Sequence, residues 1–110
     1  MVERKKSAVA DRVKQLVTAP DKRSRNYLAI ANHFERMAVQ EAWTNPDGSI
    51  YPIALVNLQS YIAFQEARVK PQTLNSYLSA LREKHEQLGF LEWEKVRFHS
   101  SIVRMMRNVK

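Results

Sequence analysis

Residues 70–90 read KPQTLNSYLSALREKHEQLGF, and the order of side chains in this stretch decides the fold class. Mostly apolar side chains return at the roughly 3.6-residue period of an α-helix, at Leu74, Tyr77, Leu78, Leu81, His85 and Leu88. Pro71 suits the first turn of such a helix, and Gly89 suits the position just beyond its end. The stretch therefore predicts one amphipathic helix, with His85 as a core or boundary residue rather than a metal ligand.

The opposite face of this predicted helix begins with small neutral hydrogen-bonding side chains, at Gln72, Asn75, Ser76 and Ser79. Such groups both donate and accept hydrogen bonds. Gln and Asn can bond base edges in the major groove, adenine in particular, whereas Ser and Thr are less selective. Ordinary helix capping, which Thr73 could assist, and a hydrated surface explain the same residues, so both interpretations stay open at this point.

The same periodicity predicts four more helices, over residues 7–19, 24–43, 52–68 and 100–109. Ser24 is placed to cap the second of them, and the apolar third is expected to be the most buried, with Val56 widening its apolar surface. The segment after Gly89 is interpreted as a linker with apolar side chains tucked over the core, at Leu91, Trp93, Val96 and Phe98. No strand-like alternation persists, so the sequence predicts an all-α fold, a compact bundle of four to five helices.

Net charge is +7, and the excess lies at the two ends of the chain. Residues 1–26 hold eight Lys and Arg against three acids, and residues 95–110 hold five against none. The middle, residues 27–94, is slightly acidic, with five basic residues against eight acids. Basic surfaces attract polyanions, so the charge favours nucleic acid, and a solvated basic surface that binds nothing stays open as the alternative.

Several classes of function are disfavoured by what the sequence lacks. Without cysteine there is no disulfide scaffold, thiolate metal site or cysteine nucleophile, and the composition fits an intracellular protein. No apolar run approaches the roughly 20 residues of a membrane helix. The three histidines are not paired at metal-ligand spacing, and no nucleophile elbow or phosphate-binding glycine loop occurs. We therefore expect no catalytic site, cofactor, metal, membrane or small-molecule substrate for this chain.

Basic and amide side chains gather at the starts of two predicted helices. Lys22, Arg23, Arg25 and Asn26 lie at one start, and Lys70, Gln72, Thr73, Asn75 and Ser76 lie at the other. Helix N-termini favour anions because their backbone N–H groups are unpaired and the helix dipole is positive there. Lys and Arg at these places would hold phosphates, and the amides would face bases.

Residues 70–90, followed by a linker and HSSIVRMMRNVK, resemble the SAM-like core-binding domain of tyrosine recombinases and phage integrases, the Cre-like enzymes. The family's central helix follows the pattern T-I/L-x-x-Y/H-L-x-x-L-x-x-x-H-x-x-x-G. Seven positions match it, at Thr73, Leu74, Tyr77, Leu78, Leu81, His85 and Gly89. The upstream stretch SRNYLAIANHFERMAVQEAW looks like the family's first core helix, so the likeness covers residues 21–110.

The resemblance implies double-stranded DNA binding, with two helices in the major groove of a recombination site. Base-facing residues would be Arg25, Asn26, Ala29, Asn32, Gln72, Thr73, Asn75 and Ser76. Phosphate contacts would come from Lys22, Arg23, Lys70, Arg82, Arg104 and Arg107. Residues 1–20 would form a helix that contacts a neighbouring protomer, so the family's habit implies a homo-oligomer on DNA.

The family's catalytic domain would follow residue 110, so this chain is not expected to be an enzyme by itself. Two alternatives stay open from the resemblance. The chain is either part of a longer recombinase or a non-catalytic relative that only binds DNA. A rival from another class is a helical module whose basic ends bind an acidic partner protein.

Overall fold

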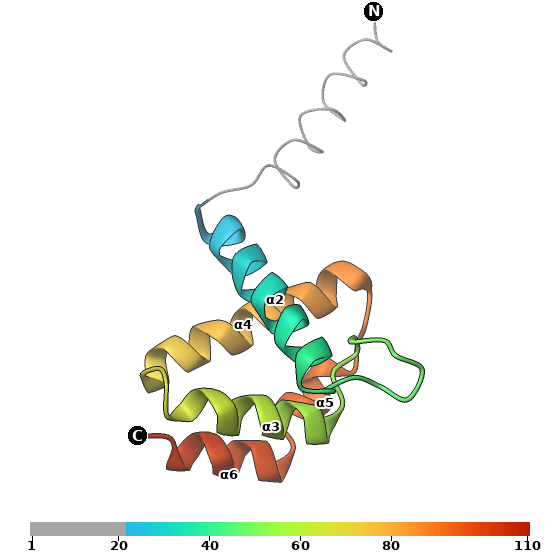
Figure 1. Cartoon of the computed structure of the whole chain (residues 1–110). Helices are drawn as coiled ribbons and strands as arrows, with labels where there is room; N and C mark the ends of the chain where they lie inside the picture. Colours follow the sequence, from blue (N-terminus) through green and yellow to red (C-terminus); the bar gives the residue numbers. More distant parts are fainter. Residues whose placement is uncertain (1–21) are drawn as a thin grey trace, which may run out of the picture.

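Five helices follow one another in residues 22–110, the part of the chain that the computed structural model describes. They are α2 (Lys22–Gln40), α3 (Leu55–Glu66), α4 (Pro71–Leu88), α5 (Trp93–Arg97) and α6 (Ser100–Asn108) (Figure 1). No strand occurs within this range, so the predicted all-α bundle is confirmed. The helix predicted over residues 7–19, with its proposed protomer contact, lies outside the described residues.

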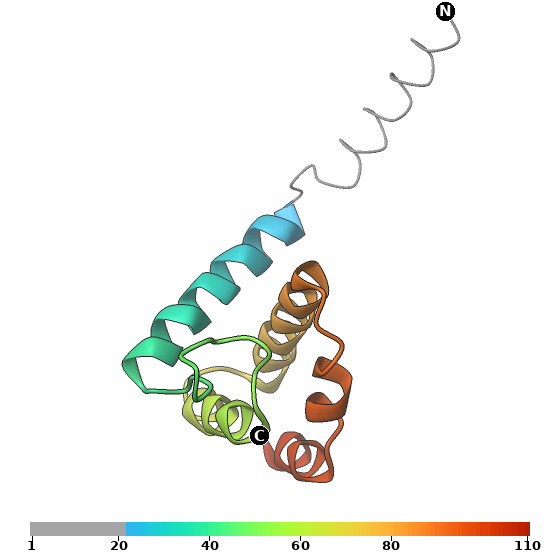
Figure 2. The same cartoon turned by 90° about the vertical axis from the view of Figure 1, so that its right-hand side faces the viewer.

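Helix α4 lies between α2 and α3 in the bundle. Helix α2 packs across one side of it, and α3 packs between α4 and α6. Figure 2 shows α2 on one side of α4, with α5 and α6 on the other. The stretch that predicts the fold class thus forms the helix that joins α2 to α3 and the rest of the bundle.

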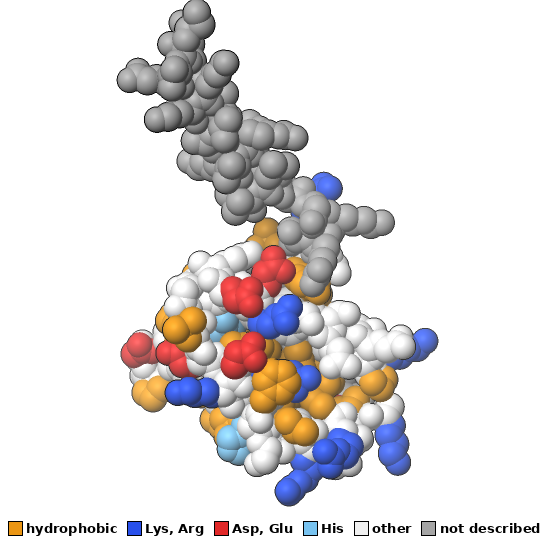
Figure 3. Space-filling view, turned by 180° about the vertical axis from the view of Figure 1, so that it is seen from behind, with side chains coloured by type: hydrophobic (Ala, Val, Ile, Leu, Met, Phe, Trp, Pro, Cys, Tyr) orange, Lys and Arg blue, Asp and Glu red, His pale blue; other side chains and the backbone are white. Residues whose placement is uncertain are grey.

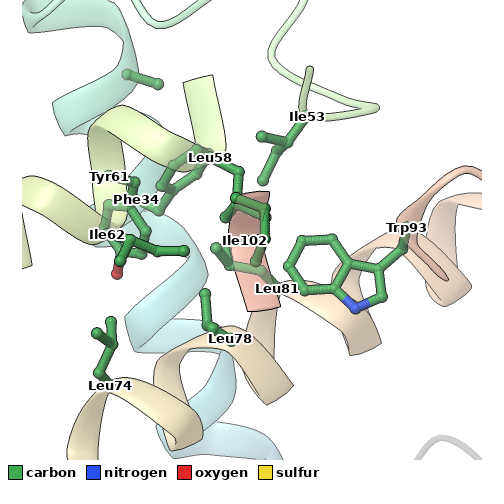
Figure 4. Close-up of a cluster of buried hydrophobic side chains, with 11 residues drawn as sticks. Phe34, Ile53, Leu58, Tyr61, Ile62, Leu74, Leu78, Leu81, Trp93 and Ile102 are labelled. Carbon is green, nitrogen blue, oxygen red and sulfur yellow. The ribbon is translucent and has the colours of Figure 1, made fainter. Parts of the chain in front are cut away.

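The core joins side chains from every described helix (Figure 4). Phe34 of α2 packs edge-on against Tyr61 of α3, with ring centres 4.9 Å apart, in the geometry that aromatic pairs prefer. Leu81 of α4 and Ile102 of α6 are fully buried beside them. Removing such aliphatic and aromatic area from water is the main stabilising term of the fold.

The segment after Gly89 is not a plain linker, because residues 93–97 form helix α5. Trp93 is 4% exposed and belongs to the core, as predicted. Leu91 and Phe98, by contrast, are 88% and 62% exposed, so the prediction that they cover the core is wrong. A helical turn directs Trp93 and Val96, three residues apart, to one side, whereas Leu91 and Phe98 lie outside this helix and face water.

The predicted helix ends are correct for α4 and shifted for α2 and α3. Pro71 begins α4, and Gly89 ends it with a φ of 80°. Helix α2 already begins at Lys22, so Ser24 is not its cap, and its helical residues end at Gln40 rather than Trp43. Helix α3 begins three residues after Pro52, at Leu55.

The late start of α3 has a cause in the loop before it. The Asn45 side chain donates to the Ser49 hydroxyl at 3.1 Å and to the Pro52 carbonyl at 2.9 Å. The Asp47 carboxylate accepts from the Ser49 N–H at 3.0 Å. Because side chain–backbone bonds of this kind compete with helix formation, they hold the loop and delay the helix.

Candidate nucleic-acid interface

The neutral face of α4 is exposed in its first turns, as predicted. Gln72, Asn75 and Ser76 are all exposed, whereas Thr73 is half-buried. Thr73 lies seven residues before the buried Ala80 and therefore on the same side of the helix. Of the four residues predicted to face bases on this helix, Thr73 is the least accessible.

A hydrogen bond within α4 occupies the donor of one exposed side chain on this face. The Ser76 hydroxyl donates to the Gln72 carbonyl at 3.2 Å, so its proton is used inside the helix. Its oxygen can still accept a bond from outside. The helix has Lys70 at its N-cap position without a side-chain cap, so the suggestion that Thr73 helps to cap the helix finds no support.

The outward face of α2 carries a stripe of exposed side chains. Arg25, Ala29 and Asn32 lie on it at the helical spacing of four and three residues, and all are exposed. Asn26 is exposed to one side of the stripe. The small Ala29 lets another molecule approach the helix closely between the longer side chains.

The stripe continues to a residue that the sequence reasoning did not single out. Arg36 lies four residues beyond Asn32 on the same face and is exposed. Its periodicity with Arg25 is visible in the sequence and could have been used to find it. The described stripe therefore has a guanidinium near each end. The side chains of Lys22 and Arg23 lie outside the described part of the chain.

Helix α2 crosses in front of α4, and both helices begin on the same side of the molecule (Figure 1). The exposed Lys70 lies at the start of α4, and the C-terminal end of α6 is on this side as well (Figure 1). Arg104 and Arg107 of α6 are exposed. The starts of α2 and α4 and the C-terminal end of α6 thus lie on one side of the molecule (Figure 1).

Basic and acidic side chains gather at different places on the side of the molecule that α5 and α6 cover. Lys and Arg gather at the right and lower right in Figure 3, and Asp and Glu gather at the upper left with other Lys and Arg side chains among them. The acids of α4 and α5 that are exposed or half-buried are Glu83, Glu86 and Glu94. An anionic partner is therefore favoured along α6 and the start of α4. Towards the end of α4 and on α5 these acids oppose it, and only a guanidinium beside them offsets their charge.

Arg82 lies apart from the other predicted phosphate contacts, more than three helical turns beyond Lys70 along α4. Its guanidinium is 3.9 Å from the Glu86 carboxylate, an exposed pair of the weak kind. It also lines a groove between α4 and α5 with a volume of about 260 Å³. The other polar and aromatic side chains around this groove include Asn75, Ser79, Trp93, Arg97 and Phe98.

Arg97 and Phe98 were not among the predicted site residues. The sequence offers no periodic signal for them, because residues 93–97 form one short helix in a segment with little amphipathic pattern. Only the packing of α5 beside α4 brings Arg97 near Asn75, 22 positions earlier in the chain.

Other kinds of site find no support in the described residues. Residues 22–110 bring no three His, Asp or Glu side chains together in an arrangement that could hold a metal ion. Within the same range, no helix has the length and apolar character required to cross a bilayer. Comparisons with protein-family models, with curated proteins and with solved structures find no match for this chain.

Proposed function

We propose that this chain binds double-stranded DNA, with the starts of α2 and α4 in the major groove. The observation that carries the proposal is the exposed neutral face of Gln72, Asn75 and Ser76, beside the cation Lys70. Amides can read base edges, and surrounding cations neutralise phosphates, which is the division of roles typical of specific DNA readers. The exposed stripe with Arg25 and Arg36 offers a second helix of similar character.

The role that fits best is that of a core-binding domain of a tyrosine-type recombinase or integrase. The support is the matched pattern from Thr73 to Gly89, together with two crossing helices whose starts share one side of the molecule. In this role the chain clamps the recombination site, and strand cleavage belongs to the family's separate catalytic domain. A non-catalytic relative would bind DNA in the same way.

Binding to a labelled duplex across a salt series tests the proposal. We expect log affinity to fall linearly with log salt, with a slope of about −0.9 for each phosphate contacted. Absence of duplex binding at low salt would overturn the proposal.

The rival function, docking of an acidic protein partner, is favoured by two exposed apolar side chains on α2. Leu28 is 52% exposed and Val39 is 68% exposed. Both lie beside the stripe of Arg25 and Arg36, where an acidic amphipathic helix would find apolar and cationic groups together. If the chain bound an acidic protein with an affinity that changed little with salt, and bound no duplex, this function would be favoured.

A further inference from the structure

The groove between α4 and α5 concentrates hydrogen-bond donors around an apolar floor. Leu78 and Trp93 are buried and form the floor. Ser79 and Arg82 line it from α4, and Arg97 lines it from α5. Guanidinium groups at two sides of a groove of about 260 Å³ are suited to an anionic group with several oxygens.

Arg97 offers free hydrogen-bond donors to such a ligand. Its side chain is half-buried, yet within residues 22–110 it has neither a hydrogen-bond acceptor nor a carboxylate at ion-pair distance. The guanidinium carbon lies 5.2 Å from the centre of the Phe98 ring, which leaves its N–H donors unused. These donors still reach water, because Arg97 contributes no buried unpartnered nitrogen. They are therefore free to bind an acceptor that enters the groove.

Burial also lowers the pKa of Arg97, and the charge of Glu94 opposes this change. Glu94 lines the same groove. Its carboxylate makes the charged form of Arg97 more favourable and repels an incoming anion. Removing that carboxylate should therefore strengthen anion binding, whereas removing Arg97 should weaken it.

We propose that this groove holds a phosphate of the DNA backbone, bound between Arg82 and Arg97. The inference rests on the proposed function, because Asn75 belongs both to the exposed face of α4 and to the wall of the groove. Seven residues separate Asn75 from Arg82, a rise of about 10 Å along the helix. The major groove is about 12 Å wide, so a helix that reads bases at its start reaches the phosphates near this point.

A phosphate fits these donors better than the carboxylate of an acidic protein. It presents several acceptor oxygens at once, and a guanidinium fork binds two of them in parallel. The Ser79 hydroxyl and the Trp93 indole N–H can bond the remaining oxygens. An acidic protein partner is kept as one outcome of the experiment.

Duplex binding of charge variants in a salt series tests the inference. Arg97→Gln should reduce the magnitude of the salt slope by about 0.9, on duplexes of any sequence. Lys95→Gln is the matched control, because Lys95 is exposed on the same helix and does not line the groove. Lys95→Gln should reduce the magnitude of the salt slope by less than half as much as Arg97→Gln does. Glu94→Gln should tighten duplex binding. Equal slopes for Arg97→Gln and Lys95→Gln would overturn the inference while leaving DNA binding intact.

A second measurement needs no variant. Addition of inorganic phosphate should shift the indole N–H resonance of Trp93 in a proton–nitrogen NMR spectrum and leave that of Trp43 unchanged. Trp43 is an internal control, because it packs against Phe64 away from the groove. A Trp93 resonance that responds to polyglutamate and not to phosphate would overturn the inference in favour of a protein partner. Failure of the wild-type protein to bind any duplex would instead overturn the proposed function itself.

Discussion

The imidazole of His85 accepts a hydrogen bond from the backbone N–H of Ile53, with Nε2 3.0 Å from the nitrogen. The other ring nitrogen, Nδ1, is 2.7 Å from the Leu81 carbonyl oxygen. Both bonds exist together only when the ring is neutral and carries its proton on Nδ1. One fully buried side chain of α4 thereby fixes the chain at Ile53, just before α3 begins.

Protonation of His85 should therefore destabilise the fold at low pH. Burial lowers the pKa of His85 from its ordinary value of 6.5, and the backbone bond to Leu81 and the charge of Glu92 oppose this only in part. Because the folded-state pKa lies below the unfolded one, the unfolded chain binds more protons between the two values. The free energy of unfolding should be highest above pH 6.5 and fall as pH decreases below it.

Urea denaturation at a series of pH values measures this dependence. His33→Gln is the matched control, since His33 is exposed on α2. The pH dependence between 6.5 and the folded-state pKa should persist in His33→Gln and shrink in His85→Gln. If His85→Gln kept the full pH dependence of the wild-type protein, another group would be responsible.

Gly89→Ala should destabilise the protein by about 1 kcal/mol. Gly89 ends α4 in the left-handed region, and the N–H groups of Gly89 and Phe90 close the helix onto the Glu86 and His85 carbonyls. A β-carbon at this position would meet no atom within 4 Å, so the whole effect comes from backbone strain. Thermal unfolding of the variant gives the change, and an unaltered midpoint would contradict this account.

Ala42→Gly should have the opposite effect and stabilise the protein by about 0.5–1 kcal/mol. Helix α2 ends in the same motif as α4, since the Trp43 N–H donates to the Ala38 carbonyl at 2.8 Å. Here, however, the left-handed position is held by an alanine, with φ of 59°. The pair of variants, measured by the same unfolding experiment, should move the midpoint in opposite directions.

Gln72→Ala should weaken site preference by about 1–3 kcal/mol, the usual value of one bidentate base contact. Asn75→Ala should act in the same direction. The measurement is the ratio of affinities for a duplex selected from a random pool and for its scrambled version. Gln87→Ala, an exposed amide at the far end of the same helix, is the control and should leave the ratio unchanged.

Equal discrimination by Gln72→Ala and the wild-type protein would show that this face of α4 does not read bases. Affinity for both duplexes could fall together in that case. Such a result would assign Gln72 to the backbone rather than to a base edge.

Arg36→Gln should weaken binding to all duplexes alike and reduce the salt slope by about 0.9. The reason is its place on the exposed stripe of α2 with Arg25 and Asn32. Lys95→Gln again supplies a control with the same loss of charge. If Arg36→Gln left the salt slope unchanged, the part of α2 beyond Asn32 would not belong to the DNA interface.

How much the sequence could predict differs between helices. Helix α4 was predicted with its ends because Pro71, Gly89 and one apolar stripe all indicate the same helix. Helix α3 is apolar on more than one face, so periodicity could not say which face would be buried. Val56, expected to widen the apolar surface, is 64% exposed, whereas Asn57 and Gln65 of the same helix are buried. Leu88 is also exposed, because the last turn of α4 extends beyond the core.

The sequence by itself determined that the chain forms an all-α bundle and that the start of α4 presents a neutral polar face. Both are local properties, set by side-chain spacing and helix-ending residues within about 20 positions. The tertiary structure alone decided that Arg97 would lie beside Asn75 and Arg82, and that His85 would fix the chain at Ile53. These contacts join residues far apart in sequence, so they depend on how whole helices pack, which no local pattern encodes.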